Sequence, residues 1–381
     1  MGPLKGVKVL EIEAMGPVPW AAMMLSDMGA DVLRLDRPVA PDIGVVRDKK
    51  FQFTERGRRS VIANLKDPAG AKAALALVSK ADVLLEGMRP GVMERLGLGP
   101  EQCLAINPAL IYGRMTGWGQ TGPLAHAVGH DINYIAVAGV LHAIGTADTP
   151  VPPLNLVGDY GGGGMLLALG VMAALIETKA SGHGQVVDAA MIDGSMSMMA
   201  AVLGRHAAGE WKDQRQSNML DGGAHFYGIY ATSDGKHVAV GAIEPHFYKA
   251  LLAGLGLDDQ ELPAQHDQQA WPALRLKFAA IFCQNTRDHW CTVFEGTEAC
   301  VSPVLSLTEI AAHPHNAHRR SFVDIGGIMH PAPSPRFSRT PGRIAGPPVD
   351  RGFGGAGALV DWGFEIGDPE LAGLSCRSAS P

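Results

Sequence analysis

Residues 7–35 decide the fold, and they read Val7-Lys-Val-Leu-Glu-Ile12-Glu-Ala-Met-Gly16-Pro-Val-Pro-Trp20-Ala-Ala-Met-Met-Leu-Ser-Asp-Met28-Gly-Ala-Asp31-Val-Leu-Arg-Leu35. Residues 7–12 alternate and are rich in branched side chains, which predicts a strand. Residues 20–28 carry apolar side chains at helical spacing, and Gly29 ends that helix. A second strand is predicted over residues 31–35. A strand, a helix and a strand in this order indicate a parallel sheet with a right-handed crossover.

The same pattern repeats further along the chain. Asp67 is a helix cap with Pro68 at the first helical position, so a helix is predicted to about Lys80. Strands are predicted over residues 82–86 and 110–116, with a short helix between them. The first 200 residues therefore predict an open, doubly wound, Rossmann-like α/β domain.

The predicted order of strands and helices changes in the second half of the chain. Residues 226–232 and 237–242 predict a hairpin, and helical segments follow at 244–255 and 272–282. After Phe322 the chain is rich in Pro and Gly, which predicts an extended return over the first domain. We expect a large α/β domain at 1–205, a linker at 206–224, a small α+β domain at 225–318, and a return linker with a C-terminal segment at 319–381 that packs on the large domain.

Composition excludes several classes of protein. The formal net charge is −6, and no basic run dominates, so we expect no nucleic-acid partner. The five cysteines are scattered without a C-x-x-C pair, which favours free thiols in a cytoplasmic protein and no zinc site. The longest apolar run, residues 165–176, is shorter than the roughly 20 residues that span a bilayer. It predicts a buried core helix in a soluble protein, and no membrane partner.

Two short motifs carry groups that could move a proton. The first is Gly129-His130-Asp131-Ile132-Asn133-Tyr134, and the second is Asn155-Leu156-Val157-Gly158-Asp159-Tyr160 followed by four glycines. We expect the glycines to open a helix whose unpaired N–H groups stabilise an anionic oxygen. An imidazole and a carboxylate on two loops can remove a proton from one face of a carbon and return one to the other. Taken alone, His130 could be structural and Asp159 a plain helix cap.

Basic residues lie where strands of the first domain end. Arg37 and Arg89 follow two predicted strands, Arg114 lies in a third, and Lys66 and Arg95 are on adjacent turns. Ligands of open α/β sheets bind at the carboxyl ends of strands, so these side chains could hold phosphates. The first turn reads Gly16-Pro17-Val18-Pro19 instead of G-x-G-x-x-G, which argues against a nicotinamide dehydrogenase.

Several long motifs together resemble the class III CoA-transferase family and, within it, the branch that racemises 2-methylacyl-CoA thioesters. The resemblance runs from Gly6 to about Thr340. It rests on the segments 129–134 and 152–159, on Glu86-Gly-Met-Arg-Pro-Gly91, on Gly117-Trp-Gly-Gln-Thr-Gly-Pro123, on Gly241-Ala-Ile-Glu-Pro245 and on Pro335-Arg-Phe-Ser-Arg339.

The resemblance implies an interlocked homodimer whose active site is shared by the large domain of one chain and the small domain of the other. His130 and Asp159 become the acid/base pair, Glu244 supports the histidine across the interface, and Asn155 supports the aspartate. The CoA moiety of the acyl-CoA substrate is the only cofactor implied. Its predicted contacts are Arg37, Ala63, Asn64, Leu65, Lys66, Leu84, Arg89, Arg95, Gly129, Asp131, Ile132, Asn133 and Tyr134, with Asn64 standing where many relatives have Asp.

The implied reaction is an isomerisation in lipid metabolism. Neutral His130 takes the C2 proton of a 2-methylacyl-CoA, and protonated Asp159 returns one through an enolate, without a metal. The alternative is CoA transfer, in which Asp159 is a nucleophile that forms an aspartyl-CoA thioester. The transferases lack a histidine at the position of His130, and they carry a glycine-rich loop that does not follow Glu244 here. The run 191–199, rich in Met, predicts core packing or a flexible surface for an acyl chain.

Overall fold

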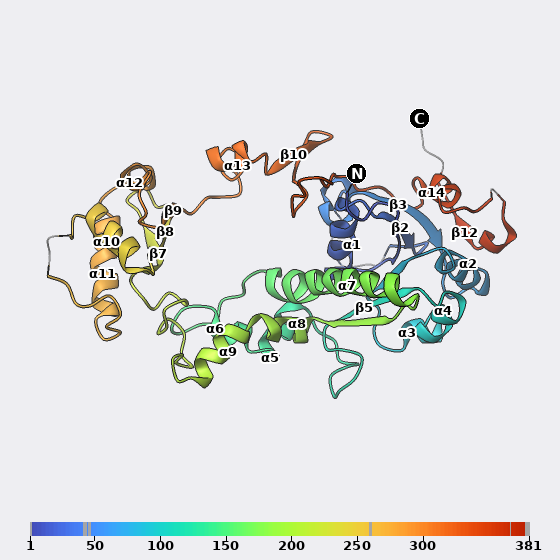
Figure 1. Ribbon diagram of the computed structural model, residues 1–381, viewed down its shortest axis with the longest axis horizontal. Helices are drawn as coiled ribbons and strands as arrows, with labels where there is room; N and C mark the ends of the chain where they lie inside the picture. The colour runs from blue at the N-terminus through green and yellow to red at the C-terminus, as the bar shows by residue number, and fades with distance from the viewer. Residues whose placement is uncertain (1, 41–43, 45–46, 259–260, 366, 378–381) are drawn as a thin grey trace. The chain divides into compact units, whose positions relative to one another are not determined.

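A seven-stranded sheet forms the centre of the first of two units in the chain (Figure 1). The structure is a computed structural model, and it describes all residues except 1, 41–43, 45–46, 259–260, 366 and 378–381. Unit 1 comprises residues 1–138, 154–198 and 318–381, and unit 2 comprises residues 139–153 and 199–317. The predicted boundaries placed residues 139–153 in the large domain, whereas the contacts of these residues group them with unit 2.

The strands of the seven-stranded sheet run in the order β12-β3-β2-β1-β4-β5-β6. Strands β1 to β6 pair in parallel, and only β12 is antiparallel. The bounds are β1 (Lys8–Ile12), β2 (Asp31–Asp36), β3 (Arg58–Ala63), β4 (Val83–Glu86), β5 (Ile111–Thr116), β6 (Val186–Ala190) and β12 (Leu374–Ser375). The strand order reverses between β1 and β4, which is where sheets of this kind bind ligands. The predicted doubly wound α/β class is confirmed.

Helices cover both faces of this sheet, because successive strand side chains point to opposite faces. Val9 packs with one layer and Leu10 with the other, and both are fully buried. The first layer contains α1 (Pro17–Asp27) and α7 (Leu166–Ser181), and the second contains α2 (Pro68–Val78) and α14 (Gly355–Asp361). Short helices α3 (Val92–Arg95) and α4 (Pro100–Ile106) lie between β4 and β5 in sequence, and α5 (Asp131–Val137) and α8 (Met191–Met198) follow β5 and β6.

The C-terminal segment belongs to unit 1. After α13 (Pro314–His318) comes an antiparallel hairpin, β10 (Phe322–Ile325) and β11 (Ile328–Pro331). The chain then reaches α14, the turn η4 (Pro369–Leu371) and β12, which pairs with β3. Trp362 is 1% exposed in the core beside Leu10, so this segment is an integral part of the sheet domain.

The longest helix combines η3 (Leu156–Met165), which has π-helical hydrogen bonding, and α7. By length and composition alone, Leu156–Ser181 is apolar enough to cross a membrane. It packs against α1, α8, β5 and β6, as the core helix of a soluble domain does. The predicted core helix is buried on one side and exposed on the other. Leu167 and Val171 are fully buried, whereas Leu169 and Ile176 are 56% and 73% exposed.

Unit 2 is a small α+β unit built on a three-stranded antiparallel sheet in the order β7-β8-β9. Its strands are β7 (Tyr227–Ala231), β8 (His237–Gly241) and β9 (Val301–Pro303), and its helices include α6 (Val140–Ala143), α9 (Ala200–Ala207), α10 (Pro245–Gly254), α11 (Trp271–Phe282) and α12 (Arg287–Phe294). The core is aromatic, with Phe226, Phe278 and Phe282 fully buried. Arg215 holds residues 139–153 in this unit by donating to the carbonyls of His142 and Thr146 at 2.9 and 2.8 Å.

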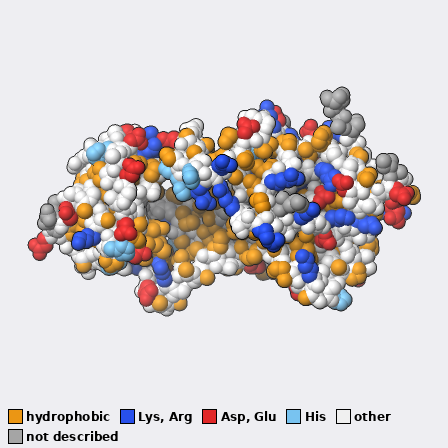
Figure 2. Space-filling view, turned by 45° about the horizontal axis from the view of Figure 1, so that its top comes forward, with side chains coloured by type: hydrophobic (Ala, Val, Ile, Leu, Met, Phe, Trp, Pro, Cys, Tyr) orange, Lys and Arg blue, Asp and Glu red, His pale blue; other side chains and the backbone are white. Residues whose placement is uncertain are grey.

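Large apolar side chains are also exposed on the surface of the chain. Figure 2 shows apolar side chains in orange between basic and acidic ones on the face it presents. The helices of unit 1 contribute Ile132 and Val137 on α5, Met165 beside α7, and Met196 and Met198 on α8, each at least 40% exposed. Met191 is buried, so the methionine-rich run is divided between core and surface.

Candidate active site

Asp159 and His130 both lie in unit 1, in η3 and at the start of α5, and these two helices contact each other. His130 is the cap residue of α5, and its main-chain N–H donates to Asn133 Oδ1 at 3.0 Å. Its side chain is exposed. Asp159 lies in the first turn of η3 and is half-buried. The two groups are close enough that the imidazole acts on the carboxyl electrostatically.

Two hydrogen bonds hold Asp159, one to its carboxyl group and one from its main chain. Asn155 Nδ2 donates to Asp159 Oδ2 at 3.0 Å. The main-chain N–H of Asp159 donates to Asp131 Oδ1 at 2.7 Å. A Cβ atom on Gly16, where φ is +67°, would meet Asp159 Oδ2 at 3.4 Å. That distance is an ordinary contact, so it is the positive φ, which L side chains rarely adopt, that favours glycine at position 16.

The surroundings of Asp159 favour its protonated form. Burial is the main cause that raises the pKa of this carboxyl, and the negative charge of Asp131 adds to it. The hydrogen bond from Asn155 and the imidazole of His130 act in the opposite direction but do not cancel the shift. A carboxyl whose pKa is raised can act as a proton donor nearer to neutral pH.

The four glycines after Tyr160 do not open a helix, so that prediction was wrong. They lie inside the continuous helix formed by η3 and α7, and Gly162, Gly163 and Gly164 are buried. A Cβ atom on Gly162 would lie 2.7 Å from Ser195 in α8, and one on Gly164 would lie 2.8 Å from the Trp20 ring in α1. The glycines let three helices pack closely, and they are not free donors for an enolate oxygen.

Asp131 and Tyr134 point into the protein from the histidine loop. Asp131 is 8% exposed, and a Cβ atom on Gly158 would lie 2.2 Å from its Oδ1. The Tyr134 hydroxyl donates to the Gly129 carbonyl, and its ring packs edge-on against Trp118 with centroids 4.8 Å apart. These two side chains shape the loop, whereas Ile132 and Asn133 are exposed on its surface.

The residues predicted to contact CoA lie near the carboxyl ends of β2, β3 and β4. Arg37 follows β2, residues 64–66 follow β3, and Arg89 follows β4. The exposed side chains among the predicted contacts are those of Arg37, Asn64, Lys66, Arg89 and Arg95. Asn64 Oδ1 accepts a hydrogen bond from the main-chain N–H of Lys66 at 3.2 Å, which holds that turn. Leu65 is half-buried, and Ala63 is buried at the end of β3.

Arg89 lies within electrostatic reach of the histidine loop. Burial and next the charge of Asp159 raise the pKa of the Tyr134 hydroxyl, and the positive charge of Arg89 opposes that shift. The side chain of Arg95 folds back toward Gly91. A Cβ atom placed on Gly91 would lie 3.2 Å from the Arg95 guanidinium. Arg89 therefore lies on the same side of unit 1 as the acid/base pair.

Two of the side chains predicted to contact the ligand have other partners in the structure. Leu84 lies inside β4, paired with Leu10 and Tyr112 on its two sides, and is 1% exposed. Its side chain therefore packs in the core and not against a ligand. Arg114 is 7% exposed and is paired with Glu86 at 2.9 Å and Glu94 at 2.8 Å. This guanidinium is a structural partner of two carboxylates and is not free for phosphate.

Glu244 lies in unit 2, where it is the residue before α10 and is exposed. Within that unit it lies near Cys300. Burial, and then the charge of Glu244, raise the pKa of the Cys300 thiol. Sequence reasoning missed Gly16, Glu13 and Arg351 near the predicted site residues. Of these three, Glu13 could have been found in the sequence, because it comes directly after the buried strand β1.

The fold and these motifs define the class of the protein. The model of CoA-transferase family III matches residues 4–351, and the chain belongs to this family. The chain is 46% identical over 340 residues to an alpha-methylacyl-CoA racemase of Mus musculus, covering 89% of this chain and 87% of the relative. It is 44% identical to the alpha-methylacyl-CoA racemase of Homo sapiens, with the same coverage of the two chains. A CAIB/BAIF family protein from Brucella suis has the same fold, with a TM-score of 0.80 at 24% identity over 95% of this chain and 99% of that one.

Proposed function

We propose that this protein is an isomerase that racemises 2-methylacyl-CoA thioesters at C2. One observation carries the proposal, namely a half-buried Asp159 with a raised pKa beside His130. The identity of 44–46% to two racemases over 89% of the chain supports the same reaction. The substrate class is accordingly an acyl-CoA, and the reaction belongs to lipid metabolism.

The reaction needs a base on one face of C2 and an acid on the other. Neutral His130 takes the C2 proton, and the electron pair moves onto the thioester oxygen to form an enolate. Protonated Asp159 then donates its proton to the opposite face of C2, which restores the thioester with inverted configuration. The enzyme is left with an imidazolium and a carboxylate, which is the correct state for the reverse direction. The raised pKa of Asp159 supports its role as the acid.

The CoA moiety would be bound along the carboxyl ends of β2, β3 and β4. Exposed Arg37, Arg89 and Arg95 supply guanidinium groups, which bind phosphate with paired N–H donors. Lys66 adds a fourth cation at the turn after β3. This arrangement requires no metal ion and no cofactor besides the CoA that the substrate carries.

We further propose that the active protein is an interlocked homodimer and that Glu244 supports the His130 of the other chain. The exposed apolar side chains on α5, α7 and α8 support an interface on unit 1. The contact of two chains would bury these side chains. The five free cysteines fit a reducing compartment, and we place the protein in the cytoplasm.

CoA transfer is the second candidate, because the family carries that name. In that reaction Asp159 would attack the thioester carbonyl and form an aspartyl-CoA thioester. Burial favours the protonated carboxyl, which is a poor nucleophile. The neighbouring imidazole likewise serves a proton transfer more directly than a displacement.

The experiment that tests the proposal is incubation of the protein with a panel of 2-methylacyl-CoA esters in D2O. Racemisation through an enolate must place deuterium on C2, and it must proceed without an acceptor acid. Addition of a chelator should leave the rate unchanged. The proposal fails if no ester gains deuterium while CoA moves to an added carboxylic acid.

A further inference from the structure

We propose that residues 346–354, which we call the strap, complete a phosphate site that Arg37 begins, and that Arg351 does so by neutralising Glu13. This inference rests on the proposed CoA ester substrate and names the part of it that is recognised. The ligand group is the phosphate monoester on the adenosine ribose of CoA. Arg351 is a positioning residue in this account, because it acts through Glu13 and Arg37.

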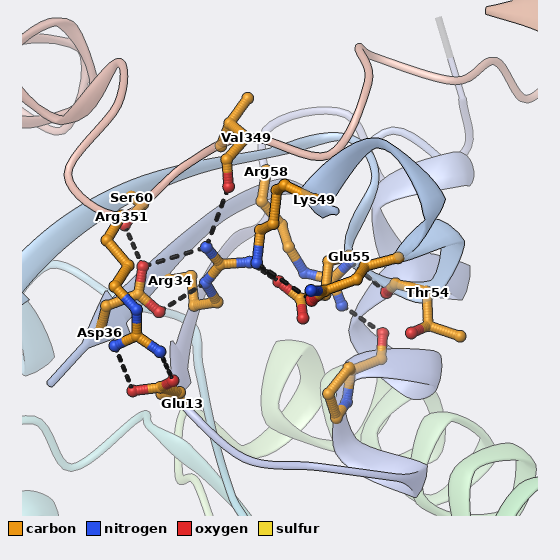
Figure 3. A network of polar contacts seen from close by, with 12 residues as sticks. Glu13, Arg34, Asp36, Lys49, Thr54, Glu55, Arg58, Ser60, Val349 and Arg351 are labelled. Atoms are coloured by element: carbon orange, nitrogen blue, oxygen red, sulfur yellow. Dashed lines mark hydrogen bonds and ion pairs between the residues drawn. The ribbon is translucent and has the colours of Figure 1, made fainter. Parts of the chain in front are cut away.

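The Glu13 carboxylate holds two guanidinium groups, those of Arg37 and Arg351. Figure 3 shows Arg351 on this carboxylate. Glu13 follows β1, and its Oε2 accepts from Arg351 Nη1 at 3.0 Å while Oε1 accepts from Arg351 Nη2. Arg37 Nε lies 3.2 Å from Glu13 Oε2, and the Arg37 main-chain N–H donates to the same oxygen at 2.9 Å. Arg351 Nη1 also donates to the Arg37 carbonyl at 2.6 Å. Arg351 thus holds both the carboxylate and the backbone that carries Arg37.

The strap is anchored to the sheet over its whole length. The main-chain N–H of Gly57 donates to the Gly346 carbonyl at 2.9 Å. Further along, Gly352 donates to Ser60 Oγ at 2.8 Å, and the Ser60 N–H donates to the Phe353 carbonyl at 2.9 Å. These contacts set the strap beside β3 and fix the position from which Arg351 reaches across β2.

A buried ion pair beneath the strap makes the end of β2 rigid. Arg34 donates to both oxygens of Asp36, at 2.7 and 3.0 Å, and the two side chains are 3% and 2% exposed. Arg34 also donates to the Val349 carbonyl of the strap at 3.3 Å. The Ser60 hydroxyl donates to Asp36, so β2, β3 and the strap share one network (Figure 3).

The charges of Glu13, Arg37 and Arg351 together leave one positive charge that is free to attract an anion. Glu13 alone would neutralise Arg37, and the pair would attract no anion. With Arg351 present, the three side chains carry one net positive charge, and the most exposed of them is Arg37, at 44% against 21% for Arg351 and 13% for Glu13. The uncompensated charge therefore faces solvent at the carboxyl end of β2. It is a suitable place for a phosphate group.

The position in the sheet indicates which phosphate is bound. In doubly wound sheets the residue at the end of the second strand meets the adenosine ribose, and an arginine there accommodates a phosphate on that ribose. Arg37 occupies this position, one residue after β2. CoA carries a monoester phosphate on its ribose, whereas its diphosphate continues toward the pantetheine arm. We therefore assign the monoester to the site of Arg37, Glu13 and Arg351.

The test compares the dissociation constants of CoA and 3′-dephospho-CoA for the full-length protein by calorimetry. The wild type should prefer CoA, and Arg351→Ala should lower that preference by roughly tenfold, the scale of a charge-assisted interaction. The double variant Glu13→Gln with Arg351→Ala should recover most of the preference, because the unpaired carboxylate is gone. Arg377→Ala removes an exposed arginine from the same C-terminal segment and should change nothing.

Two outcomes would overturn the inference. One is an Arg351→Ala variant whose affinities for both ligands fall equally together with its melting temperature, since the strap would then be only structural. The other is a wild type that binds the two ligands equally. Failure of the proposed reaction is distinguishable, because these measurements need no turnover. A protein that prefers CoA but exchanges no C2 proton would overturn the racemase proposal and leave the phosphate site standing.

Discussion

Asp131 Oδ1 accepts the main-chain N–H of Asp159 at 2.7 Å, so the residue after His130 holds the backbone of Asp159. The two segments that carry the acid/base pair are thereby joined by one partly buried hydrogen bond. Gly158 provides the space for this contact, because a Cβ atom there would lie 2.2 Å from the Asp131 carboxylate. The proposed mechanism therefore depends on Asp131, although we predicted it only as a CoA contact.

Replacing Asp131 with Asn should move the pH–rate profile to lower pH. Burial first and Asp131 next raise the pKa of Asp159, and the amide removes the charge while keeping an acceptor oxygen. The pKa of Asp159 should fall, so the part of the profile that requires its protonated form should shift down. Profiles of kcat against pH for both proteins give the answer. An unshifted profile with a reduced rate would contradict an electrostatic role.

Replacing Arg89 or Arg95 with Ala should raise KM more than it lowers kcat. Binding of the CoA phosphates is shared by the ground state and the transition state, so its loss affects mainly affinity. Thioesters of pantetheine lack these phosphates and should respond little to either change. Steady-state kinetics with both substrates make the comparison. Equal sensitivity of full and truncated thioesters would show that these arginines do not hold the phosphates.

The small unit should lose stability in mild acid because of His225. This side chain is fully buried, its Nε2 lies 2.8 Å from the Tyr248 hydroxyl, and burial lowers its pKa from 6.5 to about 4. The unfolded chain binds a proton at higher pH than the native one does. The contribution of neutral His225 to the free energy of unfolding is therefore intact above about pH 6.5 and is lost as the pH falls toward 4. The loss is on the order of 3 kcal/mol at most.

Denaturant unfolding of the wild type and of His225→Gln at pH 7, 5.5 and 4.5 measures this effect. The glutamine cannot titrate, so the variant should lose less stability on acidification than the wild type does. His246→Gln, at an exposed position, is the matched control and should behave as the wild type. The same dependence on pH in all three proteins would contradict the role of His225.

Mixed dimers test the role of Glu244. His130→Ala and Glu244→Ala should each be inactive, and activity should return when the two are denatured together and refolded. If each site combines two chains, a heterodimer has one site with both defects and one intact site, which gives up to about half of the activity per dimer. A mixture that stays inactive would show that Glu244 serves its own chain or none.

Much of the fold could be predicted from the sequence, because β1, α1 and β2 have clear periodicity and helix-end signals. Strand β3 was missed because Arg58 and Arg59 interrupt its apolar pattern. The structure shows that Arg58 is buried and paired with Glu11 at 2.6 Å. Strand β6 was missed because it lies at the edge of the sheet with its first three residues not buried, and because α8 follows it immediately. A buried ion pair between distant residues leaves no local pattern to detect.

The site was predictable where a motif was local and not where it depended on distant residues. The motif around His130 and the Asn155–Asp159 spacing are visible in the sequence, and both residues of that spacing are hydrogen-bonded in the structure. The continuation of the helix through the glycines was not visible, because glycine usually ends a helix and here it allows close packing. The contact of Arg351 with Glu13 spans 338 residues and could come only from the folded chain.

The most direct test of the central claim is the rate of deuterium incorporation at C2 from D2O, measured for each enantiomer of one 2-methylacyl-CoA. The wild type should label both enantiomers and interconvert them, and His130→Ala and Asp159→Asn should each lower kcat by ~100-fold or more. His246→Gln, at an exposed position of unit 2, is the comparison sample for folding, and chelator-treated wild type is the one for metal independence. The contrary result is a hydroxylamine-sensitive Asp159–CoA adduct that forms only with an acceptor acid present and without any deuterium at C2.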